Sequence, residues 1–83
     1  MEIEGWLVVN GMLVREFEFE DQTAAAEFIL LVAKMSDAMG HHCEVLHHSW
    51  NKLRLSICTH DAGNTITEKD YFWAEEVNRI VGK

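Results

Sequence analysis

The chain has no proline and only two cysteines, Cys43 and Cys58, among its 83 residues. Without proline or a Ser/Gly-rich stretch, nothing in the sequence marks a linker or a domain boundary. Two cysteines are too few for the disulfide scaffold of a small secreted protein, so we expect free thiols. The sequence predicts a single domain over residues 1–83. Because a core of this size leaves little stability margin, we also expect a homodimer or homotetramer.

Basic residues are scarce as well. Seven Lys and Arg against 14 Asp and Glu give a formal net charge of −7, and such a chain repels phosphate backbones, which argues against nucleic-acid binding. No apolar run approaches the roughly 20 residues of a membrane span, and the start, MEIEGW, has neither the basic nor the apolar part of a signal peptide. We therefore expect a cytoplasmic protein that does not bind membranes.

The first half of the chain predicts a hairpin followed by a helix. Asn10-Gly11, the strongest two-residue hairpin signal, separates predicted strands at 5–9 and 12–20. The helix begins at a cap, Asp21 or Thr23, and ends at Gly40. Its core stripe recurs at helical spacing and consists of Ala25, Phe28, Ile29, Val32, Met35 and Met39.

The second half predicts the same order again. Predicted strands at 41–50 and 52–59 form a second hairpin, and a second helix begins after Thr67, which fits an N-cap with an acidic residue, Asp70, three positions later. The apolar face of this helix comprises Trp73, Ala74, Val77, Ile80 and Val81. The order ββαββα predicts an α+β fold, a four-stranded antiparallel sheet with two helices packed on one face.

Histidine is the main anomaly of the sequence, because all five lie between residues 41 and 60: His41, His42, His47, His48 and His60. On a strand, neighbours point to opposite faces, so each adjacent pair would offer one side chain to a given cleft. Three interpretations remain open: ordinary partly buried histidines, a metal site that includes Cys43, and acid–base catalysis by imidazole, which titrates near pH 6.5. Metal binding is the least favoured, since the spacing matches no ligand motif.

A set of residues spread along the chain carries a more specific signal. It comprises Asp37, His41-His42-Cys43, Trp50, Thr59-His60-Asp61-Ala62-Gly63 and Thr67-Glu68-Lys69-Asp70. Together with the lead-in from Gly5-Trp6, this pattern resembles the pterin-4a-carbinolamine dehydratases, also called 4a-hydroxytetrahydrobiopterin dehydratases, in a short form that lacks the family's leading helix. The resemblance covers nearly the whole chain.

The resemblance implies a hydro-lyase that converts a 4a-hydroxytetrahydropterin to quinonoid dihydropterin in tetrahydrobiopterin recycling, with no cofactor and no metal. It implies that His41 and His60 transfer the protons by acid–base catalysis. The residues it implies for substrate binding are His42, Asp37, Trp50, Thr59 and Asp61. Among these, Asp37 is expected to orient the first histidine, and Trp50 to form a wall for the flat ring.

The chain also departs from the family pattern. Cys43 and Val45 stand where the family has proline and an aromatic residue, and the spacing between His42 and His60 predicts a bulge in the intervening strand. Dehydratase-like proteins without this activity are known, among them a RuBisCO assembly factor of α-carboxysomes, so an assembly factor or chaperone associated with the carboxysome is the alternative function.

The alternative function would need a surface for a protein partner, RuBisCO or a hydroxylase. The candidates for such a surface lie off the core stripes of the two helices: Leu30, Leu31, Tyr71 and Phe72. The competing interpretation of the same residues is an interface between copies of this chain, which a domain this small favours.

Overall fold

The fold follows the predicted order, ββαββα, and belongs to the α+β class. The structure is a computed structural model that describes residues 3–82. Its elements are β1 (Leu7–Val9), β2 (Met12–Glu18), α1 (Gln22–Met39), β3 (Glu44–His48), β4 (Lys52–Ile57), a short 3₁₀ helix η1 (His60–Ala62) and α2 (Glu68–Val81). None of the described helices is long and apolar enough to cross a membrane.

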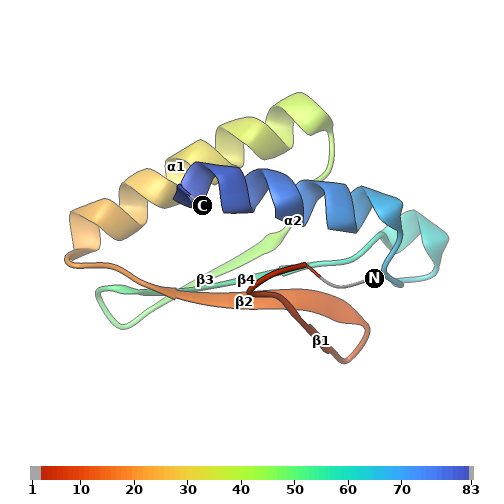
Figure 1. Ribbon diagram of the computed structural model, residues 1–83, viewed down its shortest axis with the longest axis horizontal. Helices are drawn as coiled ribbons and strands as arrows, with labels where there is room; N and C mark the ends of the chain where they lie inside the picture. Colours follow the sequence, from red (N-terminus) through yellow and green to blue (C-terminus); the bar gives the residue numbers. More distant parts are fainter. Residues whose placement is uncertain (1–2, 83) are drawn as a thin grey trace.

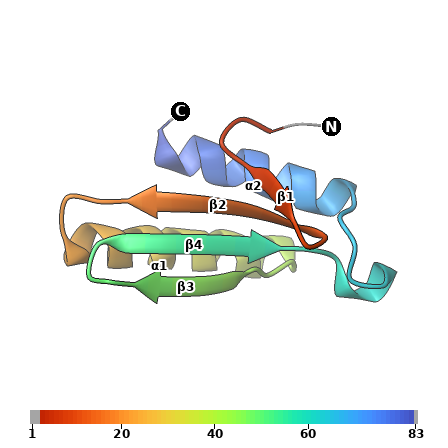
Figure 2. The same ribbon diagram turned by 90° about the horizontal axis from the view of Figure 1, so that it is seen from below.

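The four strands form one antiparallel sheet in the order β1-β2-β4-β3. Both helices cover the same face of the sheet (Figure 1). Seen from the opposite face, α2 lies behind β1 and β2, and α1 lies behind β4 and β3 (Figure 2). The predicted bulge in the third strand is wrong, because β3 pairs with β4 residue for residue from Glu44 opposite Ser56 to His48 opposite Lys52. The irregular residue is Ser49, in the turn, with φ 58°.

The local signals for turns and caps are confirmed. Asn10 and Gly11 both have positive φ, 52° and 78°, as a two-residue type I′ hairpin turn requires. Asp21 caps α1, since its Oδ1 accepts a hydrogen bond from the backbone N–H of Ala24 at 2.8 Å. Gly40 ends the helix in the left-handed conformation with φ 68°, which turns the chain away from the helix axis.

One apolar core lies between the helices and the sheet. Its fully buried members alternate along the strands and recur at helical spacing, as predicted, and include Leu13, Leu53, Leu55, Ile57, Val32, Trp73 and Val77. The end of α2 differs from the prediction, because Val81 sits in the last turn and is exposed. Of the two aromatic residues predicted to be exposed on α2, Tyr71 is half-buried against the core and Phe72 is 57% exposed. Leu30 and Leu31 are exposed, as predicted.

Candidate active site

Three stretches that are distant in sequence meet at one end of the molecule: the end of α1 with the chain leading into β3, the end of β4 with the turn after it, and the start of α2 (Figure 1). They enclose a cavity of about 220 Å³. Its lining consists of Gly40, His41, His42, Cys58, Thr59, His60, Asp61 and Lys69. Three of the five histidines therefore share one cavity.

The adjacent pair His41-His42 lies outside the strand in which it was predicted. β3 begins at Glu44, and the residues between Gly40 and that strand have no regular structure. The alternation rule of strands does not apply there, and both residues line the cavity rather than one. The physical reason is the left-handed turn at Gly40, which leads the chain across the opening before it enters the sheet.

The second histidine pair has no part in this cavity. The Nε2 atom of His47 lies 3.0 Å from the backbone oxygen of Trp50, and His48 faces Glu16 at 3.8 Å. Both residues belong to the other end of the β3–β4 hairpin.

Asp70 holds His41 from beneath the cavity. Its carboxylate has no exposure to solvent, and its Oδ1 lies 2.7 Å from Nε2 of His41. Its Oδ2 accepts two hydrogen bonds of 2.8 Å, one from the hydroxyl of Thr59 and one from the backbone N–H of Thr67. A carboxylate without solvent exposure is costly unless its oxygens are hydrogen-bonded. Two of the partners of Asp70, His41 and Thr59, line the cavity, and the third is the N–H of Thr67 at the helix cap.

The other two histidines of the cavity are held at its rim. In His60, Nδ1 lies 2.6 Å from Oδ1 of Asn64, which closes the turn after η1. In His42, Nε2 lies 2.9 Å from Oδ1 of Asp37, one turn before the end of α1. We expected Asp37 to orient the first histidine, His41. In the structure Asp37 pairs with His42 instead, and His41 pairs with Asp70.

Trp50 is the one predicted site residue that the structure places far from the cavity. It lies in the turn between β3 and β4, while the cavity lies beyond the opposite end of β4. Six strand residues separate the two, a distance of about 20 Å at ~3.3 Å per residue. Five of the predicted residues line the cavity together: His41, His42, Thr59, His60 and Asp61. Asp37 does not line it but is hydrogen-bonded to His42.

Three participants were not predicted in these roles: Asp70 as the partner of His41, Asn64 as the partner of His60, and Lys69 in the cavity wall. Asp70 belongs to the pattern that carries the resemblance, and its position three residues after Thr67 predicts a helix cap, but neither signal paired it with a histidine. The cap is present, and the second oxygen of the same carboxylate binds the histidine.

The two thiols are not suited to nucleophilic attack. Burial, with a smaller contribution from the charge of Glu44, raises the pKa of Cys43 from 9.0 to about 11, and burial also raises the pKa of the Cys58 thiol. Both cysteines are free, and the thiolate is the reactive form. Within residues 3–82 no group of three or more His, Cys, Asp or Glu side chains is placed to hold a metal ion.

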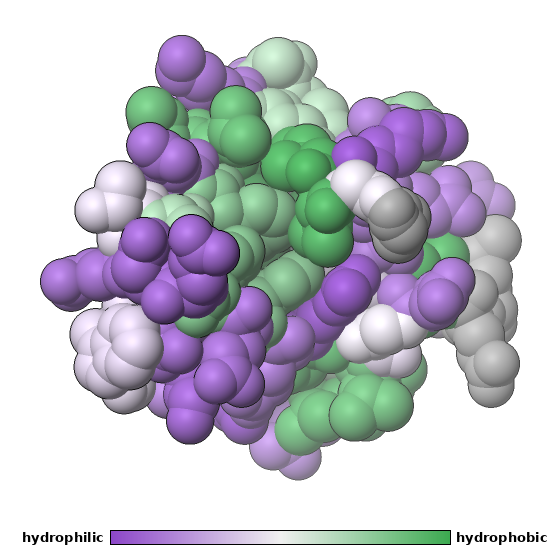
Figure 3. Space-filling view, turned by 60° about the vertical axis from the view of Figure 1, so that its left-hand side comes forward, coloured by the Kyte–Doolittle hydropathy of each residue, from purple (hydrophilic) through white to green (hydrophobic). Residues whose placement is uncertain are grey.

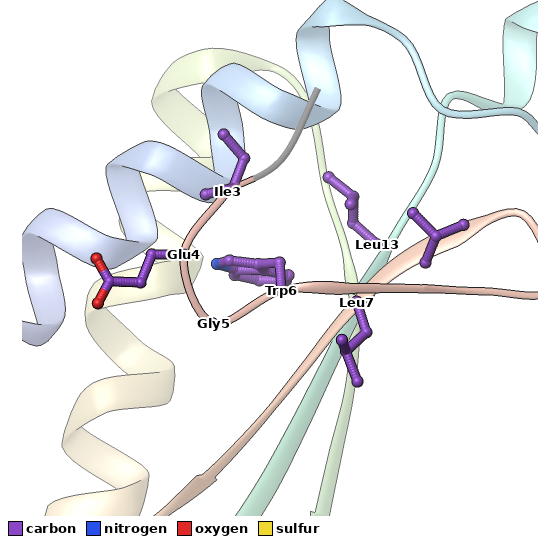
Figure 4. Close-up of a pocket in the computed structure, with 7 residues that line it drawn as sticks. Ile3, Glu4, Gly5, Trp6, Leu7 and Leu13 are labelled. Carbon is purple, nitrogen blue, oxygen red and sulfur yellow. The ribbon is translucent and has the colours of Figure 1, made fainter.

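A larger hollow of about 580 Å³ lies near the start of the chain, lined by Ile3, Glu4, Gly5, Trp6, Leu7, Val8 and Leu13. Glu4 is its only titratable side chain, and the carboxylate points away from the other lining side chains (Figure 4). Trp6 turns inward beneath α2, where its indole donates a hydrogen bond to Asn78. No histidine lines this hollow, whereas three line the smaller cavity.

Comparison with known proteins finds similar chains of one family. Residues 1–80 match the family model described as "Pterin 4 alpha carbinolamine dehydratase". The chain is 38% identical over 77 residues to a protein of Chloroflexus aurantiacus named "Putative pterin-4-alpha-carbinolamine dehydratase", covering 93% of this chain and 81% of the relative.

Two solved structures resemble the fold. A transcriptional coactivator/pterin dehydratase from Brucella melitensis superposes with a TM-score of 0.85 at 30% identity, over 95% of this chain and 84% of the other. A pterin dehydratase-like protein described as a RuBisCO assembly factor in the α-carboxysome superposes with a TM-score of 0.75 at 16% identity, over 94% and 88% of the two chains.

Proposed function

The chain belongs to the pterin 4 alpha carbinolamine dehydratase family, and from this membership we propose that it dehydrates a 4a-hydroxytetrahydropterin to the quinonoid dihydropterin. One observation carries the proposal: the cavity lined by His41, His42 and His60, in which the imidazole of His41 is hydrogen-bonded to the buried carboxylate of Asp70. A cavity with two tethered imidazoles suits a reaction that consists of two proton transfers.

The reaction removes one molecule of water. The bond between the ring carbon and its hydroxyl breaks as an acid delivers a proton to the departing oxygen. A base removes the proton of the neighbouring ring nitrogen, whose electrons form the new C=N double bond. The proton gained by the base balances the proton lost by the acid, so the two side chains finish the turnover in exchanged protonation states.

We assign the acid to His41 and the base to His60. The carboxylate of Asp70 can balance the charge of a protonated His41, whereas the partner of His60 is the neutral amide of Asn64. In each residue the tether occupies one ring nitrogen and fixes the ring orientation, so the other nitrogen exchanges the proton with substrate. That nitrogen is Nδ1 in His41 and Nε2 in His60.

The remaining side chains of the cavity are assigned to substrate binding. The carboxylate of Asp61 can accept hydrogen bonds from the amino and amide N–H groups of a pterin. Thr59 lines the same cavity, and because its hydroxyl donates to Asp70, we assign it to shaping the wall rather than to a hydrogen bond with the ring. His42 lines the opening, and Asp37 fixes its ring from outside the cavity. Trp50 has no role in this assignment because of its distance from the cavity.

The direct test is the rate of carbinolamine dehydration, followed by the absorbance of the quinonoid product over the uncatalysed background. His41→Ala and His60→Ala should each lose the ~10²–10⁴-fold that positioned proton transfer contributes. The matched control is His47→Ala, a histidine on β3 at the far end of the hairpin, which should retain the wild-type rate. If wild-type protein shows no rate above background, the enzyme assignment fails.

A second candidate function is a binding role without catalysis, like that of the dehydratase-like RuBisCO assembly factor that shares the fold. The observation that favours it is the exposure of Leu30 and Leu31, 54% and 51%, at consecutive positions of α1. Leu30→Ser with Leu31→Ser should then abolish co-sedimentation with a RuBisCO partner without unfolding the domain. If the double variant instead breaks up an oligomer, these residues form the interface between copies.

A further inference from the structure

The cavity over the histidines is small for an organic substrate. It measures about 220 Å³, whereas pockets that enclose small organic ligands usually measure ~300–1,000 Å³. A bicyclic ring whose reacting carbon lies between His41 and His60 must therefore extend into neighbouring space.

That space lies on the far side of His41. A second cavity of about 300 Å³ shares Gly40, His41 and Lys69 with the first, and its other walls are Met39 and Phe72. The two cavities thus adjoin each other, with Gly40, His41 and Lys69 between them. The second one is lined mainly by a thioether and a phenyl ring, which suits the flat face of a ring rather than its polar edge.

Phe72 has no part in the core of the domain. Its side chain is 57% exposed, while the buried face of α2 is formed by Trp73, Ala74 and Val77. It lies three residues after Lys69, on the same face of the helix, and both line the cavity beside His41. The sequence predicted an aromatic wall at Trp50, which lies at the far end of β4, so Phe72 is the aromatic side chain available at this position.

On the basis of the proposed function, we propose that Phe72 is a substrate-binding residue that covers one face of the pterin ring where the ring passes His41, with Met39 beneath it and Lys69 at the edge. The half of the ring beyond His41 stacks on the phenyl group. Phe72 then determines affinity and the preference for flat heteroaromatic bicycles, and it takes no part in proton transfer.

The test compares three substitutions at this position. Phe72→Ala should raise KM for the carbinolamine roughly 10-fold and leave kcat within about twofold, because stacking acts on the bound ring and not on the protons. Phe72→Tyr keeps the ring and should restore the wild-type KM, while Phe72→Leu keeps apolar bulk without a ring and should behave like the alanine variant. Leu46→Ala, which removes a similarly exposed apolar side chain from β3, is the control and should match wild type.

A second measurement separates binding from catalysis. The oxidised parent pterin is flat and has no hydroxyl to lose, and titration of its fluorescence gives a Kd for each variant. If wild-type protein binds this pterin and Phe72→Ala weakens the binding roughly 10-fold, the proposal for Phe72 is supported. This holds even if the protein does not dehydrate the carbinolamine, in which case only the catalytic assignment fails. Wild-type dehydration with an unchanged KM and Kd in Phe72→Ala overturns the role of Phe72 and leaves catalysis intact. A change in sedimentation with no change in Kd also overturns it, since Phe72 would then lie between copies of the chain.

Discussion

His41 and Asp70 are 29 positions apart in the sequence, and their side chains meet at 2.7 Å, between Nε2 of the imidazole and Oδ1 of a carboxylate with no solvent exposure. The contact joins the segment after α1 to the first turn of α2. Since the same carboxylate also caps α2 through the N–H of Thr67, the position of the imidazole depends on the start of this helix.

Asp70→Asn should therefore lower both stability and activity. The amide can replace only part of the acceptor set that serves His41, Thr59 and Thr67, so we expect a loss of about 1–3 kcal/mol in the free energy of unfolding. We expect kcat to fall roughly 10–100-fold, as when a residue that orients a functional histidine is changed. Urea denaturation and initial rates measure the two effects. Asp37→Asn, at an exposed carboxylate, should leave the urea midpoint unchanged, and an Asp70→Asn midpoint equal to wild type would contradict this account.

Asn64→Gly should slow the reaction without unfolding the protein. The change removes the acceptor for Nδ1 of His60 and keeps a residue that tolerates the left-handed φ of 59° at this position. We expect kcat to fall about 10-fold with little change in KM, because the ring of His60 loses its fixed orientation. Asn64→Asp keeps an oxygen acceptor and serves as the rescue variant. Equal kcat values for Asn64→Gly and wild type would show that the tether has no effect.

Cys43 should resist alkylation in the folded protein. A pKa of about 11 in place of 9.0 reduces the thiolate fraction near neutral pH about 100-fold, and the thiolate is the reactive species. Mass spectrometry after timed exposure to iodoacetamide, with and without urea, gives the rate at each cysteine. Reaction in the native state as fast as in urea would contradict the shift. Cys58 is buried, with a pKa also raised by burial, and should react no faster than Cys43.

The chain should sediment as a dimer or tetramer. The domain of 9.6 kDa leaves many apolar side chains exposed, namely Leu7, Val8, Val9, Leu30, Leu31, Val45, Leu46, Trp50, Phe72 and Val81. On the face seen from the end where α1 begins, apolar residues gather in the middle beside hydrophilic ones (Figure 3). Association buries such surface and adds to the small stability of a short domain. Sedimentation equilibrium at micromolar concentration should give two or four times the monomer mass, and a mass of 9.6 kDa would refute the prediction.

Signals that act between neighbouring residues predicted most of the fold. The prediction of the site was incomplete because the site depends on contacts between residues that are distant in sequence. Asn10-Gly11, Asp21 and Gly40 act within a few residues of themselves, so their turn and caps could be read directly. The pairing of His41 with Asp70, by contrast, requires that α2 lie beside the end of α1. The resemblance implied that Asp37 orients the first histidine, whereas the chain after Gly40 brings His42 to Asp37 and His41 to Asp70.

The position of Trp50 illustrates the same limit. A motif fixes the order of residues along a hairpin, but the length of β4 separates its turn from its open end. Residues that are close to His60 in the pattern can therefore lie at the opposite end of the sheet. Phe72, in a different element, could be placed beside His41 only from the packing of α2.

The shared carboxylate of Asp70 also couples the tether of His41, the proposed acid, to the dynamics of the helix start. When the first turn of α2 frays, the N–H of Thr67 loses its acceptor at the same moment that His41 loses its tether. Hydrogen–deuterium exchange at the amide of Thr67 therefore reports how often the site comes apart. The fraction of molecules with this amide protected sets an upper limit on the fraction competent to react, so exchange and turnover should change together across variants of this turn.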